Sequence, residues 1–309
     1  MTTPTDVPLE IPPDASSAAA PPRSTLYWSV RRELWENRSV YIAPLAVAAL
    51  VLFASLVAMY TLPGHALPGK IGAALDPARQ HLAAIRPFRT APAPIMAASF
   101  IVGMFYALDA LYGERRDRSI LFWKSLPVSD LTTVLAKASI PLVVLPLIAF
   151  VLSMAVLAVL LFPVTVILMG TGVSLARLWR EVLLEQPPIM FYGLAAHALW
   201  FAPIYGWLLL VSAWARRTPF LWALSPVVLA VVEKVAFQTG YICALLKSRV
   251  IGGMAEAFIP GPPSRGDVTH LVELDPLGFL VSPGLWIGLA TAALFLAAAV
   301  RLRRRGEPI

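Results

Sequence analysis

Charged side chains are scarce in this chain. Asp, Glu, Lys and Arg make up 14% of its 309 residues, whereas they make up roughly a quarter of a typical soluble domain. Hydrophobic residues account for 58% and the mean hydropathy is +0.73. This composition places most of the chain in lipid. The single cysteine, Cys243, excludes an internal disulfide and a zinc cluster that needs several cysteines.

Sequence motifs of nucleotide-binding and hydrolytic sites are missing as well. The chain has no GxxxxGK[ST] phosphate-binding loop, so any ATP is expected to bind to a partner chain. It has no HExxH or GxSxG motif, and its four histidines are scattered. We therefore expect a protein that is not itself an enzyme and that binds no metal or cofactor of its own.

Long apolar runs are abundant. A helix needs roughly 20 apolar residues to cross a hydrocarbon core about 30 Å thick. Six runs of this kind predict six transmembrane helices, at about 40–62, 93–112, 139–162, 189–214, 219–246 and 280–300. The predicted fold class is an all-α integral membrane protein. Residues 24–305 are expected to form one transmembrane domain between a disordered cytoplasmic tail, 1–23, and a C-terminal tail, 306–309.

The basic residues predict the orientation of these helices. With the N-terminus inside, the cytoplasmic segments hold fifteen Lys and Arg residues and the outside segments hold nine. The positive-inside rule then puts both termini in the cytoplasm, as in a multi-pass protein of the bacterial inner membrane. Lys and Arg residues next to apolar spans typically fix the topology and contact lipid headgroups. The net charge of +7 therefore predicts membrane lipids as partners and no nucleic acid.

A short amphipathic segment precedes the first run. Residues 26–38 read LYWSVRRELWENR, in which Leu26, Val30 and Leu34 share one side with two aromatic residues, while Arg32 and Glu33 face away. Tryptophan and arginine on such a helix favour a position in the membrane interface. The segment is either a simple anchor or an element that transmits motion.

The largest cytoplasmic loop lies between the second and third runs. Residues 113–138 read GERRDRSILFWKSLPVSDLTTVLAKA, in which a charged cluster is followed by the apolar residues 120–123. Apolar and aromatic groups bracketed by charge are typical of a docking surface for a partner. The alternative is that these aromatic side chains dip into the headgroup layer.

This succession of an interfacial helix, two spans and the 113–138 loop resembles the permease subunits of type-2 ABC exporters. In that family the loop carries an acidic residue, a short coupling helix and a Leu-Pro element; here Glu114, residues 116–123 and Leu126-Pro127 occupy these places. The family often has Gly-Thr where this chain has Arg118-Ser119. The resemblance implies that the ATPase-coupling residues are Glu114, Arg116, Arg118, Ile120, Phe122, Trp123 and Lys124.

The resemblance also implies partners and a mechanism. The chain would form half of the substrate pathway, paired with a second permease copy or a paralogue. A separate ABC-type ATP-binding subunit would bind ATP and magnesium and drive export. Residues 246–280 would contain re-entrant helices before the last span.

Three ionisable residues within apolar runs are candidates for a pathway or gate. Glu233 and Lys234 interrupt the fifth run, and His197 lies in the fourth. A charge in the hydrocarbon core costs about 2.5–3.5 kcal/mol on insertion scales, so each needs a partner, a wet cavity or a path to the surface. Glu233 either faces the pathway with His197 or a second permease as its partner, or snorkels outward with Lys234.

Two other functions remain open at this point. A proton- or ion-coupled secondary transporter would use Glu233, Lys234 and His197 as its relay. A membrane enzyme acting on lipid-linked substrates would need paired carboxylates at one membrane face. The tight acidic group formed by Asp109, Glu114 and Asp117 is interleaved with arginines.

Overall fold

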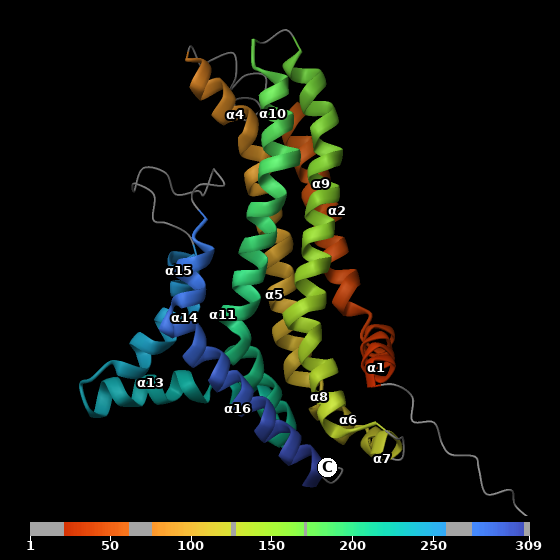
Figure 1. The fold of residues 1–309 in the computed structure, drawn as a ribbon, viewed down its shortest axis with the longest axis vertical. Helices are drawn as coiled ribbons and strands as arrows, with labels where there is room; N and C mark the ends of the chain where they lie inside the picture. Colours follow the sequence, from red (N-terminus) through yellow and green to blue (C-terminus); the bar gives the residue numbers. More distant parts are fainter. Residues whose placement is uncertain (1–21, 62–75, 125–127, 170–171, 258–273, 306–309) are drawn as a thin grey trace, which may run out of the picture.

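The computed structural model describes residues 22–61, 76–124, 128–169, 172–257 and 274–305. The regular elements of these residues are helices, and the longest of them form an elongated bundle (Figure 1). Of the predicted tails, residues 1–21 of the segment 1–23 and all of 306–309 lie outside the described residues, while Pro22 and Arg23 begin a helix. Also outside the described residues are Leu126-Pro127 and residues 258–273 of the segment 246–280 that the resemblance assigns to re-entrant helices.

Within these described residues, five helices are long and apolar enough to cross a membrane, by length and composition. Three of them are built from consecutive segments that continue one another. The five are α2 (Ser39–Thr61); α4–α5–α6 (Pro77–Thr90, Pro92–Asp109, Tyr112–Arg116); α8–η1–α9 (Asp130–Ser139, Ile140–Val144, Leu145–Leu168); α10–η2–α11 (Leu175–Arg180, Glu181–Glu185, Gln186–Trp214); and α16 (Pro283–Arg305). The chain therefore has the architecture of an all-helical, multi-pass membrane protein.

The three composite helices are longer than a membrane core requires. Their spanning segments have 38, 39 and 40 residues, which at 1.5 Å per residue corresponds to nearly 60 Å. About half of this length is enough for the hydrocarbon. Their ends must therefore project into the headgroup layers, where α4 and α10 form one end of the bundle and α6 and α8 form the other (Figure 1).

The prediction of a sixth span at 219–246 is not confirmed, because this run is broken into three helices. These are α12 (Pro219–Ala223), α13 (Ser225–Ala236) and α14 (Tyr241–Ala257). With 12 residues, α13 would reach only about 18 Å. The chain turns after α13, where Gln238 has a φ of 54°. The Glu233 carboxylate accepts hydrogen bonds from the amides of Tyr241 and Ile242 at 2.8 and 2.7 Å, so it caps a new helix.

The interior is apolar and centres on α11. One hydrophobic cluster joins α2, α4, α5, α9 and α11, and a second joins α5, α11, α15 (Pro276–Val281) and α16. At Gly206, α11 packs directly against α16, and an added Cβ would lie 3.3 Å from the carbonyl oxygen of Ala292. Small residues at such crossings let helix backbones pack directly, which is the usual basis of helix association in membranes.

The N-terminal helix, α1 (Pro22–Glu36), is seen nearly end-on in Figure 1 and so runs across the bundle. Its aromatic residues Tyr27, Trp28 and Trp35 are exposed, whereas Glu33 is completely buried. Val30 and Leu34 pack on the bundle near Val40 and Tyr106. The helix therefore turns aromatic side chains outward and a carboxylate inward.

Candidate functional site

Four elements that are distant in sequence meet at one end of the bundle (Figure 1). They are α1, the α6–α7 loop with α7 at Ser119–Lys124, α8, and the C-terminal end of α16. A cluster of six charged side chains joins them, which we call the charge cluster: Arg32, Glu33, Glu114, Asp130, Lys137 and Arg303. Three are acidic and three are basic, and the half-exposed Glu36 adds a fourth carboxylate at its edge, 3.6 Å from Arg32 Nε. Buried charges are costly unless they are paired and hydrogen-bonded in this way.

Glu33 is the innermost member. Its Oε1 atom lies 2.8 Å from Arg32 Nη2 and 2.9 Å from Lys137 Nζ. Its Oε2 atom accepts a 2.8 Å hydrogen bond from the Tyr106 hydroxyl and a 3.1 Å one from Lys137. Burial alone would raise the pKa of Glu33, but the Lys137 ammonium and these hydrogen bonds bring the pKa below its ordinary value. Glu33 is therefore held as a carboxylate.

Glu114 connects the α6–α7 loop to the rest of the cluster. Lys137 Nζ lies 3.1 Å from Glu114 Oε1 as an ion pair that lacks hydrogen-bond geometry. Arg303 hydrogen-bonds to the other oxygen of Glu114, and its Nε donates to Asp130 at 3.1 Å. Lys137 and Arg303 are both almost fully buried. The loop is thus tied through one carboxylate to α8 and α16.

The loop is also attached to the C-terminus of α11. Arg115 Nη2 donates to the carbonyls of Ser212 and Ala215 at 2.9 and 2.6 Å. The Ser212 hydroxyl accepts from the amides of Leu111 and Tyr112, both at 2.9 Å. These contacts satisfy carbonyls that a helix end leaves without partners. The base of the loop is therefore held by α11.

The helix α7, which the resemblance assigns to coupling, presents different side chains to the protein and to its surroundings. Ile120 is buried, whereas Leu121 and Phe122 are 58% and 60% exposed. Trp123 lies under the Arg32 guanidinium, with the Arg32 Cζ atom 3.9 Å from the ring centroid. This cation–π contact joins α7 to α1. The segment therefore offers an apolar patch, Leu121 and Phe122, on a base that is held in place.

The remaining predicted coupling residues are at the surface. Arg116 is exposed and pairs with Asp117 at 3.0 Å. Arg118 is exposed and has a φ of 58°, in the left-handed region that glycine adopts most easily. The side chain of Lys124 lies outside the described residues.

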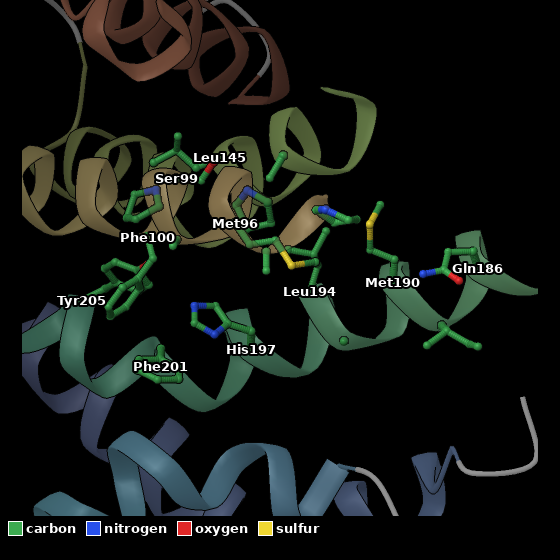
Figure 2. Close-up of a pocket in the computed structure, with 18 of the residues that line it drawn as sticks. Met96, Ser99, Phe100, Leu145, Gln186, Met190, Leu194, His197, Phe201 and Tyr205 are labelled. Carbon is green, nitrogen blue, oxygen red and sulfur yellow. The ribbon is translucent and has the colours of Figure 1, made fainter. Parts of the chain in front are cut away.

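The three predicted gate residues are not brought together. In the described part of the chain no hydrogen bond or ion pair joins Glu233 to His197. All hydrogen bonds of the Glu233 side chain lie in the turn between α13 and α14, including one from the Thr239 hydroxyl at 2.8 Å. Lys234 is exposed. His197 instead stacks on Phe201, with ring centroids 4.2 Å apart, and lines a cavity of about 580 Å³ (Figure 2).

The sequence indicated Glu114 as a site residue but missed the rest of the charge cluster. A signal was available, since Lys137 directly precedes an apolar run and Arg303 closely follows one, and a charge at the edge of a span needs a partner. The partners of these residues lie between 23 and 189 positions away along the chain. No periodic pattern connects positions at such separations.

Comparison with protein-family models, with curated proteins and with solved structures finds no match for this chain.

Proposed function

We propose that the chain is the transmembrane permease subunit of an ATP-driven ABC exporter, with its ATPase on a separate chain. In this proposal α7 is the coupling helix. It docks on the ATP-binding subunit, which binds ATP and magnesium. A second permease copy or a paralogue completes the substrate pathway, and both termini lie on the cytoplasmic side of a bacterial inner membrane.

The exposed patch on α7 supports the docking step. Leu121 and Phe122 are adjacent, exposed and flanked by charge, at an end of the bundle where the chain is rich in Lys and Arg. A buried aromatic side chain surrounded by polar groups is the usual centre of a protein interface. The backbone of Arg118 also supports the resemblance, since it has the conformation that suits the glycine common at this place in the family.

The charge cluster is the observation that carries the proposal. A force applied to α7 has a direct route to α1 through Trp123 and Arg32, and to α8 and α16 through Glu114. Ion pairs in a buried, low-dielectric setting are stiff compared with exposed ones. A coupling helix needs such a connection if nucleotide-driven closure of the ATPases is to move spanning helices.

Affinity purification of the full chain in a mild detergent tests the assembly. We expect an ABC-type ATPase to copurify. The Phe122→Ala variant should bind it about 30-fold more weakly, because a buried aromatic at an interface centre contributes about 2 kcal/mol. Phe237→Ala is the matched control, since Phe237 is also exposed but lies in the turn after α13; it should leave binding unchanged.

Two results would contradict the proposal. One is that no ABC-type ATPase copurifies although the chain is intact and monodisperse. The other is that Phe122→Ala and Phe237→Ala have equal effects, which would mean that α7 rests on lipid instead of an ATPase.

A further inference from the structure

The cavity beside His197 is lined by residues of α4, α5, η1, α9, α11 and α14 (Figure 2). Its volume of about 580 Å³ lies within the roughly 300–1,000 Å³ of small-molecule sites. Most of its lining is apolar, with Met96, Leu145, Met190 and Leu194 among the residues that form it. It is also long. Gln186 and Tyr205 both line it and are 19 residues apart on α11, which corresponds to about 28 Å.

The deep end of the cavity is aromatic and has a polar group without a partner. Phe100 lies 5.1 Å from Phe201 and 5.4 Å from His197 between ring centroids. Tyr205 is only 2% exposed, yet its hydroxyl makes no hydrogen bond to any residue that the structure describes. Tyr205 lines the cavity, so a bound molecule with a polar group can supply a hydrogen-bond partner for this hydroxyl.

The opposite end carries a cation. Arg89, at the end of α4, and Gln186, at the start of α11, line the cavity there. Arg89 is half-buried, and within the described residues it has neither an ion-pair partner nor a hydrogen-bond acceptor. It lies next to the apolar run that begins at residue 93, at the depth of lipid headgroups. An ionised guanidinium at this place favours an anion, and it binds carboxylate or phosphate through two parallel hydrogen bonds.

We infer that this cavity binds an amphipathic anion. Its carboxylate or phosphate head pairs with Arg89 and Gln186, and its apolar chain runs along α11 toward Tyr205. The hydroxyl of Tyr205 and the ring of His197 offer polar contacts to a group at the far end of that chain. This inference does not depend on the proposed ATPase coupling, because binding can be measured on the purified chain alone.

Binding to the full chain tests the inference. The chain is delipidated in a neutral detergent and titrated with three probes, and the complexes are observed by native mass spectrometry. The probes are hexadecanoate, hexadecyl phosphate and the uncharged hexadecanol. We expect one anion to bind per chain and hexadecanol to bind at least about tenfold more weakly, since a charge-assisted pair with Arg89 is missing. The tighter of the two anions identifies the headgroup.

Two pairs of variants locate the site. Arg89→Gln should abolish the preference for the anions, whereas Arg86→Gln should keep it, because Arg86 is exposed on the same helix and does not line the cavity. Ala97→Phe should fill the cavity and weaken all three probes. Ala54→Phe, on an exposed face of α2, should weaken none.

The inference is overturned if hexadecanol binds as tightly as the anions, or if Arg86→Gln reduces binding as much as Arg89→Gln. It is equally overturned if Ala97→Phe, shown to be folded by its monodisperse elution, binds the probes like the unmodified chain.

Discussion

Replacing Lys137 with methionine tests whether the charge cluster holds its end of the bundle together. Methionine keeps the length and the apolar stem of the side chain but removes its charge. The change deletes the 2.9 and 3.1 Å contacts of Nζ with the Glu33 carboxylate and the 3.1 Å contact with Glu114. Two buried carboxylates then share the two remaining cations, Arg32 and Arg303.

The expected cost follows from this geometry. Removing one partner of a buried ion pair costs about 3–5 kcal/mol. The lower end applies here, because Glu33 keeps its bonds from Arg32 and Tyr106 and Glu114 keeps its bond from Arg303. A loss of about 3 kcal/mol corresponds to a fall in apparent Tm of about 5 °C for a chain of 309 residues.

The effect should also depend on pH. With Lys137 present, the pKa of Glu33 lies below its ordinary value, so this carboxylate contributes stability that is lost as the pH falls through that lowered pKa. Without Lys137, the pKa of Glu33 should rise, because burial remains while the largest influence that lowers this pKa is removed. The neutral form of Glu33 is then populated at a higher pH in the variant. The Tm difference between the variant and the unmodified chain should therefore shrink as the pH is lowered from 8 to about 5.

Thermal unfolding of the purified chain in detergent measures both effects, with Lys234→Met as the control because Lys234 is exposed. A double-mutant cycle with Glu33→Gln separates the pair energy from the single changes. A Tm loss in Lys137→Met no larger than that in Lys234→Met would refute the reasoning. Strict additivity in the cycle would refute it as well, since residues in direct contact should couple.

Three further changes probe other parts of the fold. Arg118→Gly should leave the apparent Tm unchanged or raise it, because a left-handed residue at φ 58° costs about 1 kcal/mol when it is not glycine. Glu233→Ala should speed amide exchange at Tyr241, whose N–H loses its acceptor. Gly206→Val should lower the Tm strongly, because its Cβ would meet the backbone of Ala292 at 3.3 Å and separate α11 from α16.

Each of these changes has a matched control. Arg116→Gly, within α6, should destabilise by about 0.5–1 kcal/mol because the residue is helical. Lys234→Ala should leave exchange at Tyr241 unaltered. Gly240→Val should be tolerated, since nothing lies within 4 Å of an added Cβ there. If a control changes the Tm or the amide exchange rate as its partner variant does, the local explanation for that residue is wrong.

The sequence allowed more of the fold than of the site to be predicted. Five of the six apolar runs coincide with helices of spanning length. The sixth run, at 219–246, is not confirmed as one spanning helix. Hydropathy is summed over a window, whereas a single carboxylate at Glu233 can end one helix by capping the next. The sequence predicted a short helix with exposed apolar residues in the α6–α7 loop, and the structure has a helix there. Trp123, however, packs on Arg32 and is not part of the exposed patch.

The amino-acid sequence by itself determined that this chain is helical and apolar enough for a membrane, because the free energy of transfer into lipid is nearly a sum over the residues of each run. Only the tertiary structure decided which charges meet. Glu33, Glu114, Lys137 and Arg303 come from four different elements, and their pairing depends on helix packing angles and side-chain reach. Those quantities belong to contacts between distant segments, and no local pattern in the chain encodes them.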